Sequence, residues 1–180
     1  SRPAERRRLS QALDAHMLDI HDNGLIPEGD PAEGWAASRA PGVYPLPALM
    51  RLAADAASRD PSKLPRLAAA LSGGNAIARY WGATGLLILG DQARKAQEAL
   101  GRAAASDASA AVRVVASEAI AGLGDGEGVR FLGALAAPPF PWQTRLAALN
   151  ALTALGEAAR PVLPAIDAAA NSDQEYLRNA

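Results

Sequence analysis

The sequence predicts an all-α superhelix of about three and a half stacked helix pairs, preceded by an extra N-terminal helix and a long packed loop. Composition is the first observation: alanine and leucine dominate the 180 residues, and only 4% are aromatic. The second is a set of apolar positions that recurs roughly every 33 residues, and the third is a glycine at the end of each recurring helix. A fixed period of this length is typical of repeat proteins whose units bury their apolar faces against their neighbours.

The first predicted helix runs from about Pro3 to His21. Pro3 suits a first helical turn, and Gly24 suits a stop. One helical face collects positions at the spacing i, i+3, i+4, i+7; they are Leu9, Ala12, Leu13, His16, Met17 and Ile20. This spacing predicts a helix that buries one side.

Residues 24–47 predict a loop, because five prolines and four glycines fall within them. The same segment holds apolar side chains that suit a packed loop better than a free linker: Leu25, Ile26, Trp35, Val43 and Tyr44. A loop of this length is uncommon in a compact domain unless it lies against something. We therefore divide the chain into residues 1–46, the end of a neighbouring domain, and residues 47–180, the repeats.

Three segments align as the second helix of each pair: Ala78–Gly90, Val112–Gly124 and Thr144–Gly156. Each has an arginine as its second residue and ends with a glycine, at intervals of 34 and 32 residues; these are Arg79, Arg113 and Arg145, and Gly90, Gly124 and Gly156. The glycines are expected to form left-handed caps. The columns between them are expected to face the core: Trp81/Val115/Ala147, Gly82/Ala116/Ala148, Gly85/Ala119/Ala151, Leu86/Ile120/Leu152 and Leu89/Leu123/Leu155.

A first helix precedes each of these, with a central apolar column at Leu67, Leu100, Leu132 and Ile166. The fourth unit is short: its first helix is predicted at Glu157–Ser172, and its second stops near Arg178. Residues 47–59 predict a degenerate earlier second helix. The alanine and glycine columns allow close helix packing, so a core with few aromatic side chains can still be dense.

Val112-Arg113 near the start of a second helix, after Asp107 in the turn, resembles HEAT-type repeats at the period of their shorter variety. The resemblance implies that the arginine column bonds carbonyl groups of its own turns. Gly73 and Pro139 stand where Asp107 stands. An Asp–Arg contact within the turn is therefore expected in the second repeat alone.

The candidate interaction residues are Trp142, Phe140, Arg79, Arg113 and Arg145. Trp142 and Phe140 belong to an apolar turn whose exposure would mark a contact site. The arginines could line a phosphate-binding groove, although bonding within their own turns is the preferred interpretation. Trp81 is expected in the core.

No catalytic, cofactor-binding or metal-binding residues are predicted. G-x-S-x-G and H-E-x-x-H are absent, and no spacing forces a pair of carboxylates together. One His/carboxylate cluster occurs, but its histidines are five residues apart, about 140° around a helix; its members are His16, Asp19, His21, Asp22 and Glu28. Gly124–Gly128 is expected to be a flexible turn.

Composition excludes further classes. Without cysteine there is no disulfide scaffold, thiolate zinc site or iron–sulfur cluster. The net charge of −1 gives no general attraction to nucleic acid. No apolar run approaches the roughly 18 residues of a membrane span, so neither nucleic acid nor a membrane is an expected partner.

Two stretches go beyond the needs of repeat packing: Ala12–Glu28, which contains Asp-Asn-Gly-Leu-Ile-Pro-Glu, and Val43–Gly90, which contains Arg79-Tyr80-Trp81. With the Leu-Asn-Ala-Leu-Thr-Ala-Leu-Gly run that ends at Gly156, they resemble the C-terminal part of bacterial sulfatases of the alkaline-phosphatase-like superfamily. In that group D-x-G-x-(I/L)-P-E closes the catalytic domain, and some members continue into HEAT-like repeats with an R-Y-W-(G/A)-A motif. The family's C-x-P-x-R or S-x-P-x-R motif and its metal-ligand motifs are missing, so no catalytic residue carries over.

The expected function is that of a non-catalytic HEAT-like repeat domain, the C-terminal fragment of a sulfatase, acting in protein–protein or inter-domain contact. The resemblance implies that calcium and formylglycine belong to a catalytic domain outside this fragment, and that the protein is periplasmic or exported. Expected partners are that domain, another protein or a second copy. One alternative is a free-standing HEAT-like scaffold or lyase-type partner protein. Another is a nucleic-acid-binding HEAT-like module with a basic face among Arg94, Lys95, Arg102 and Arg113.

Overall fold

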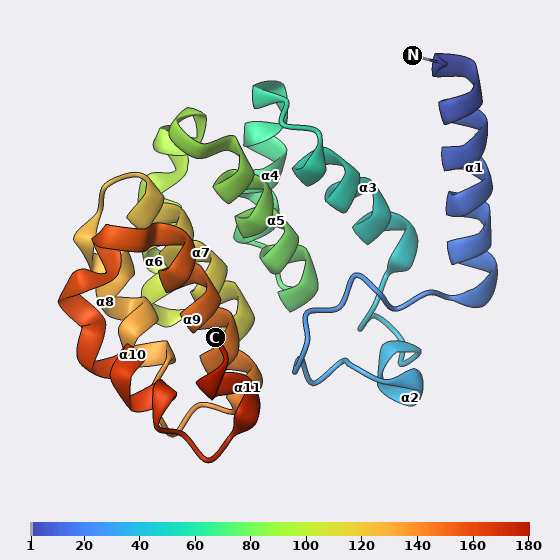
Figure 1. Ribbon diagram of the computed structural model, residues 1–180. Coiled ribbons are helices and arrows are strands. Elements are labelled where there is room, and N and C mark those ends of the chain that lie inside the picture. The colour runs from blue at the N-terminus through green and yellow to red at the C-terminus, as the bar shows by residue number, and fades with distance from the viewer. Residues whose placement is uncertain (1) are drawn as a thin grey trace.

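The computed structural model describes residues 2–180, and these residues form helices and no β-strand. The all-α prediction is therefore confirmed. The chain begins with α1 (Pro3–Ile20), crosses an irregular segment that contains the short α2 (Trp35–Ser38), and enters α3 (Leu46–Ala57). In Figure 1, α1 stands apart from the remaining helices. Within residues 2–180, no helix has both the length and the apolar character needed to cross a bilayer.

Three helix pairs follow α3: α4 (Leu64–Leu71) with α5 (Ala76–Leu89), α6 (Gln97–Ser106) with α7 (Ala110–Gly122), and α8 (Gly126–Leu135) with α9 (Trp142–Leu155). The second helices begin at intervals of 34 and 32 residues, as the arginine column predicts. Each first helix packs against its own second helix, and α3, α5, α7 and α9 pack in sequence against one another. Residues 47–59 indeed behave as an earlier second helix, because α3 packs on α5.

Short 3-10 helices join the pairs: η1 (Pro61–Lys63), η2 (Gly90–Ala96) and η3 (Gly156–Val162). The prediction of one helix over Glu157–Ser172 was wrong, because the chain forms η3 and then α10 (Leu163–Ala170). Pro161 lies in η3, and Pro164 lies in the first turn of α10. A proline is tolerated at such positions and disrupts the interior of an α-helix. The chain ends with α11 (Glu175–Arg178).

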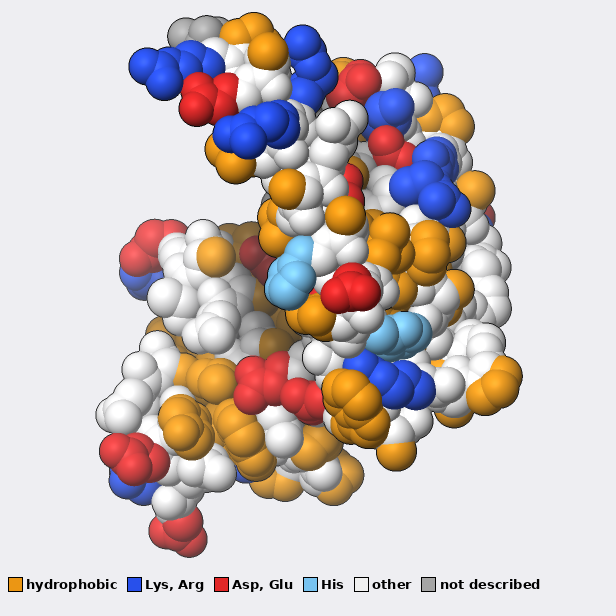
Figure 2. All heavy atoms as spheres, turned by 90° about the vertical axis from the view of Figure 1, so that its right-hand side faces the viewer, with side chains coloured by type: hydrophobic (Ala, Val, Ile, Leu, Met, Phe, Trp, Pro, Cys, Tyr) orange, Lys and Arg blue, Asp and Glu red, His pale blue; other side chains and the backbone are white. Residues whose placement is uncertain are grey.

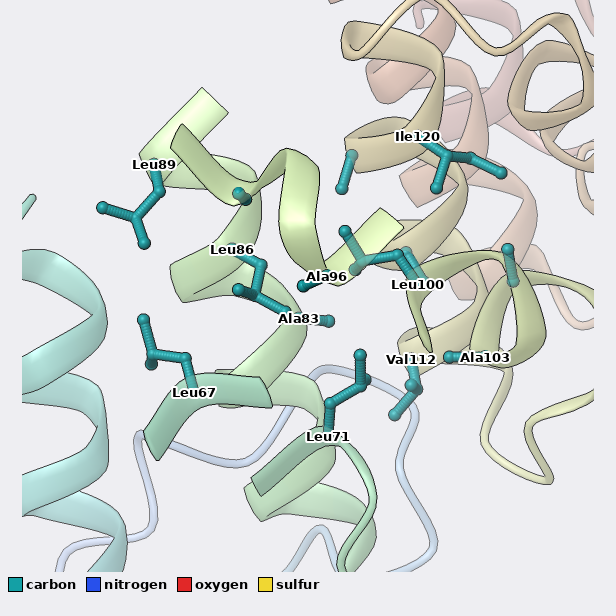
Figure 3. Packing of buried hydrophobic residues seen from close by; sticks show 14 of the residues in the cluster. Leu67, Leu71, Ala83, Leu86, Leu89, Ala96, Leu100, Ala103, Val112 and Ile120 are labelled. Atoms are coloured by element: carbon teal, nitrogen blue, oxygen red, sulfur yellow. The ribbon is translucent and has the colours of Figure 1, made fainter. Parts of the chain in front are cut away.

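The core lies between the first and second helices and continues from one pair to the next. Figure 3 shows this interior, where Leu67 and Leu100 of the first helices meet Leu86 and Ile120 of the second helices. Each of these four side chains is at most 1% exposed. The predicted columns through Gly82, Gly85 and Leu86 are buried in all three second helices. Their packing holds consecutive pairs together.

The predicted column through Trp81 is less buried than these three columns. Trp81 and Val115 are half-buried, and Ala147 is exposed. The column lies at the edge of the buried face. In α5 this edge is covered by the 24–46 segment, whose apolar residues pack with Trp81. Trp81 and Val115 nevertheless pack against the buried cluster, so the expectation of a core position is confirmed in part for them and was wrong for Ala147.

The glycines at the ends of α5 and α9 adopt a different conformation from the left-handed cap that was expected. Gly90 has φ 55° and ψ −131°, and Gly156 has φ 57° and ψ −124°. This combination lies outside the left-handed helical region and is accessible mainly to glycine. Gly124 also has a positive φ, 91°. At Gly124 the left-handed cap is confirmed, because the backbone N–H groups of Gly124 and Asp125 donate to the Ala121 and Ile120 carbonyl oxygens at 2.9 and 3.0 Å. The expected cap geometry was therefore wrong for Gly90 and Gly156 alone.

Candidate functional site

A cleft of about 740 Å³ lies between residues 28–43 and the N-terminal ends of α5, α7 and α9. Small side chains dominate its walls, among them Ala32, Ala37, Ala40, Ala76, Ala110 and Ala111. Gly29 approaches Gln143 so closely that a methyl group on Gly29 would lie 3.0 Å from the Gln143 Cβ. The segment therefore reaches from the first repeat to the third.

Hydrogen bonds fasten the segment to the repeats. Trp81 Nε1 donates to the Leu25 carbonyl oxygen at 2.9 Å, and Asn75 Nδ2 donates to the Val43 carbonyl oxygen at 2.9 Å. Within the segment itself, the hydroxyl oxygen of buried Tyr44 accepts from the Leu25 backbone N–H at 3.3 Å. Tyr44 also belongs to one apolar cluster with Ile77 of α5. Burial also raises the pKa of the Tyr44 phenol above its usual value. The expectation that this loop packs on the chain is confirmed.

The two walls of the cleft carry opposite electrostatic character. The helix wall presents three N-terminal ends, which bear partial positive charge. Asn75 and Ser109 cap two of them, by accepting from the backbone N–H groups of Ala78 and Val112. The loop wall carries Glu28 and Asp30. The Asp30 carboxylate accepts from the Ala32 backbone N–H within its own turn at 2.8 Å.

Arg79, at the rim of the cleft, is bonded to Asp107 rather than free. Its Nε and Nη2 donate to the two Asp107 carboxylate oxygens at 2.7 and 2.9 Å. These bonds raise the pKa of the Arg79 guanidinium. The predicted contact of Asp107 with the arginine of its own repeat was wrong, because Asp107 turns back to the preceding repeat.

The other two arginines of the column bond main-chain oxygens. Arg113 Nε donates to the Ala104 carbonyl oxygen at 3.3 Å, and Arg145 Nε donates to the Ala136 carbonyl oxygen at 3.1 Å. Each acceptor lies nine residues earlier, at the end of the paired first helix. These bonds agree with the expectation that the arginines bond carbonyl groups of their own turns. The same side chains would have to bind phosphate if the column lined a phosphate-binding groove.

Trp142 and Phe140 do not project freely. Trp142, half-buried, stacks on Tyr176 of α11 with ring centres 5.1 Å apart and planes 17° apart. The Arg113 guanidinium lies over the Phe140 ring, 5.5 Å from its centre. The candidate interaction residues therefore divide into two places, with Arg79 at the cleft and the aromatic pair near the C-terminal end.

The basic residues named for a nucleic-acid face are mostly engaged with their neighbours. Arg94 pairs with Asp91 and also donates to the Leu123 carbonyl oxygen at 3.2 Å. Arg102 pairs with Glu98. Nearby acidic groups thus offset much of this positive charge.

The His/carboxylate cluster is not brought together. His16 is exposed on α1, whereas His21 is half-buried with its ring 6.0 Å from that of Tyr44. Across residues 2–180, no three His, Cys, Asp or Glu side chains converge in a way that could hold a metal ion. In the Gly124–Gly128 run, α8 begins at Gly126 and Asp125 is its N-cap. The expected turn is therefore limited to Gly124 and Asp125.

The structure leaves the predicted apolar face of α1 uncovered. No residue of α1 is buried, and Leu9 and Leu13 are each 58% exposed. Trp35, 74% exposed, lies near the C-terminal end of α1, because Arg39 stacks on its ring and donates to the Ile20 carbonyl oxygen. Figure 2 views this side of the molecule, with basic side chains around the start of α1 at the top. The prediction of a buried helix face was wrong within residues 2–180.

Sequence reasoning missed Glu118 and Tyr80. Burial raises the pKa of the Glu118 carboxyl, and burial and Glu118 both raise the pKa of the Tyr80 hydroxyl. The available signal was the position of Glu118 among apolar residues of α7. It is the one carboxyl between Val112 and Ile120.

Comparison with known proteins identifies no relative of this chain. The chain matches no protein-family model, no curated protein and no solved structure.

Proposed function

We propose that this chain is a non-catalytic HEAT-like repeat domain that works by contact with another protein surface. The observation that carries the proposal is the exposed apolar face of α1. Most helical stability in proteins comes from packing of the apolar face, and no residue of α1 is buried. A covering surface would supply that packing.

The order of contacts supports the HEAT-like superhelix. Each second helix packs against the second helix of the next pair. The first helices α4, α6 and α8 likewise contact one another in order. Packing of each unit on its nearest neighbours is what defines a solenoid. Solenoids present extended surfaces, which suits a role in contact.

The resemblance to sulfatases supports a narrower proposal, that the repeats form the C-terminal part of such an enzyme. Its support is a contact between the two stretches that carry the resemblance. Trp81, of the Arg79-Tyr80-Trp81 motif, donates to Leu25, of the Asp-Asn-Gly-Leu-Ile-Pro-Glu motif. Glu28 and Arg79, one from each motif, line the same cleft. Under this proposal the sulfate-ester chemistry resides outside residues 2–180.

Amide hydrogen exchange in dilute protein tests the contact function. Without a covering surface, we expect amides of α1 to exchange orders of magnitude faster than those of α5, because local opening costs little where no packing is lost. The double substitution Leu9→Ser and Leu13→Ser should leave the melting temperature of the repeats unchanged, whereas Leu67→Ala should lower it. If α1 were as protected as α5 in a dilute monomer, it would need no partner and the proposal would fail.

A further inference from the structure

The charges on α1 run against its own dipole. Residues 2–9 hold four arginines and one glutamate, and residues 10–22 hold three aspartates and no lysine or arginine. Anions stabilise a helix near its N-terminus and cations near its C-terminus, so this order weakens an isolated α1. The charges are also little used within the chain: among residues 2–180, Arg2 pairs with Glu5, and Arg8 and Asp19 form no ion pair.

Of the exposed apolar residues of α1, Leu18 lies on one side of the helix. The opposite side carries a narrow stripe, defined by Leu9, Leu13, His16 and Ile20. At 100° per residue these four lie within about 60° of one another, at the alternating spacing of four and three residues that suits pairing with a second helix. Every one of them is exposed. An open groove of about 460 Å³ also runs along the first half of the helix past Leu9 and Leu13. Since α1 stands apart from the repeats (Figure 1), a second helix can reach the stripe.

We propose that α1 pairs with α1 of a second copy of this chain, antiparallel, around a twofold axis. This inference rests on the proposed contact function and names its partner. Antiparallel pairing sets the basic half of each helix against the acidic half of the other, and it also opposes the two dipoles. Both features that weaken a lone α1 therefore become favourable in the pair.

The stripe fixes the register of the pair. With the twofold axis between positions 13 and 16, Leu9 meets the partner's Ile20, and Leu13 meets the partner's His16. Arg8 and Asp19 lie on the same side of the stripe, about 100° from Leu9. In an antiparallel pair the same sides face each other, so Arg8 comes within one turn of the partner's Asp19. Twofold symmetry makes this contact twice.

Disulfide trapping tests both the pairing and its direction, since the chain has no cysteine of its own. Leu9→Cys mixed with Ile20→Cys should give a linked heterodimer under mild oxidation. Either variant alone should stay unlinked, because identical positions are about 16 Å apart along an antiparallel pair. Gln11→Cys, on the opposite side of α1, is the matched control and should not link to Ile20→Cys.

A charge exchange tests the electrostatic part by light scattering. Arg8→Glu should weaken dimerisation by about tenfold, as should Asp19→Arg. The double variant restores the complementary pairs and should recover the dimer. A merely structural role of either residue within the monomer would not show this recovery.

Three results overturn the inference. A linked dimer from Leu9→Cys alone would mean parallel pairing. A monomer at the highest soluble concentration, with fast exchange in α1, would mean that another surface, such as a preceding domain, covers the stripe; the contact function would then survive. A monomer in which α1 is protected from exchange would contradict both the contact function and the α1 pairing, because the helix would then be stable without a covering surface.

Discussion

Asp107 binds Arg79 of the preceding repeat through both carboxylate oxygens, at 2.7 and 2.9 Å. One of those oxygens also accepts from the Ser109 backbone N–H at 2.8 Å, just before α7 begins. Arg79 Nη1 in turn donates to the Gly73 and Gly74 carbonyl oxygens at 3.1 and 3.0 Å. The pair thus ties the turn before α5 to the turn before α7, and the Asp107 side chain is only 7% exposed.

Replacement of Asp107 by alanine should therefore destabilise the protein. The change leaves a largely buried guanidinium without its carboxylate and removes the bond to Ser109. Hydrogen bonds to charged groups contribute about 1.5–3 kcal/mol, and we expect a loss of that order in the urea unfolding free energy. Asp91→Ala, which breaks the exposed pair with Arg94, should change it by less than about 1 kcal/mol. Equal effects of the two substitutions would contradict the bridging role.

Two glycine-to-alanine substitutions should have opposite signs. A methyl group at Gly82 would lie 2.8 Å from the Leu67 carbonyl oxygen and 2.8 Å from the Leu71 nitrogen, both backbone atoms that cannot move cheaply. Gly82→Ala should cost about 1–3 kcal/mol by forcing α4 and α5 apart. Gly101→Ala, in α6 with nothing within 4 Å, should gain about 0.5–1 kcal/mol from helix propensity. Thermal unfolding measures both, and a stabilising Gly82→Ala would refute the close approach.

Loss of the Trp81 indole N–H should loosen the 24–46 segment. Trp81→Phe keeps an aromatic ring but removes the donor to Leu25, at a cost of about 1 kcal/mol. Limited proteolysis should then cut within residues 24–46 faster, while the repeat helices stay resistant. Trp35→Phe is the control in the same segment, since Trp35 is 74% exposed and should leave the cleavage rate unchanged. Unaltered cleavage in Trp81→Phe would show that other contacts hold the segment.

Glu118 should make stability fall as pH rises. Burial raises the pKa of its carboxyl in the folded protein above the ordinary value of 4.5, so the folded state binds the proton more tightly than the unfolded state. Its favourable contribution is complete below the ordinary pKa and is lost as pH rises through the raised one. Glu118→Gln should therefore be more stable than the parent near pH 7, and the difference should vanish below about pH 4. Melting temperatures across this range, with exposed Glu98→Gln as control, check the sign; a gain independent of pH would point to packing instead.

Much of the helical order follows from local sequence, and the exceptions have physical causes. The columns at Leu67 and Leu86 predict burial correctly, apart from half-buried Ile166, because period and apolar identity coincide. The split of the last unit into η3 and α10 repeats the split of residues 90–106 into η2 and α6, which contain no proline, so it belongs to the connection between units and not to the prolines of the last unit alone. The uncovered face of α1 could not be anticipated, because an apolar stripe indicates that a helix packs without indicating on which molecule.

The cleft was less predictable than the helices. It forms where residues 28–43 meet helix ends from three repeats, and no spacing along the chain encodes that meeting. Trp81 illustrates the difficulty. Its column suggests a core position, but its indole N–H donates to the carbonyl oxygen of Leu25, 56 residues earlier in the chain. Asp107 is similar: its place in the turn was evident, and its choice of Arg79 over Arg113 depends on how successive repeats are rotated.

The contact between Gly29 and Gln143 restricts how this architecture can change in size. The irregular segment is anchored at α5 by Trp81 and meets the start of α9 at Gly29. Duplication of a helix pair between α5 and α9 would push these points apart by about 8–10 Å, the spacing of packed helices, and would pull the segment from one of its ends. A pair added after α11 would leave it undisturbed. The number of units beneath the segment is therefore constrained by the length of the segment, whereas units beyond α9 are free of this constraint.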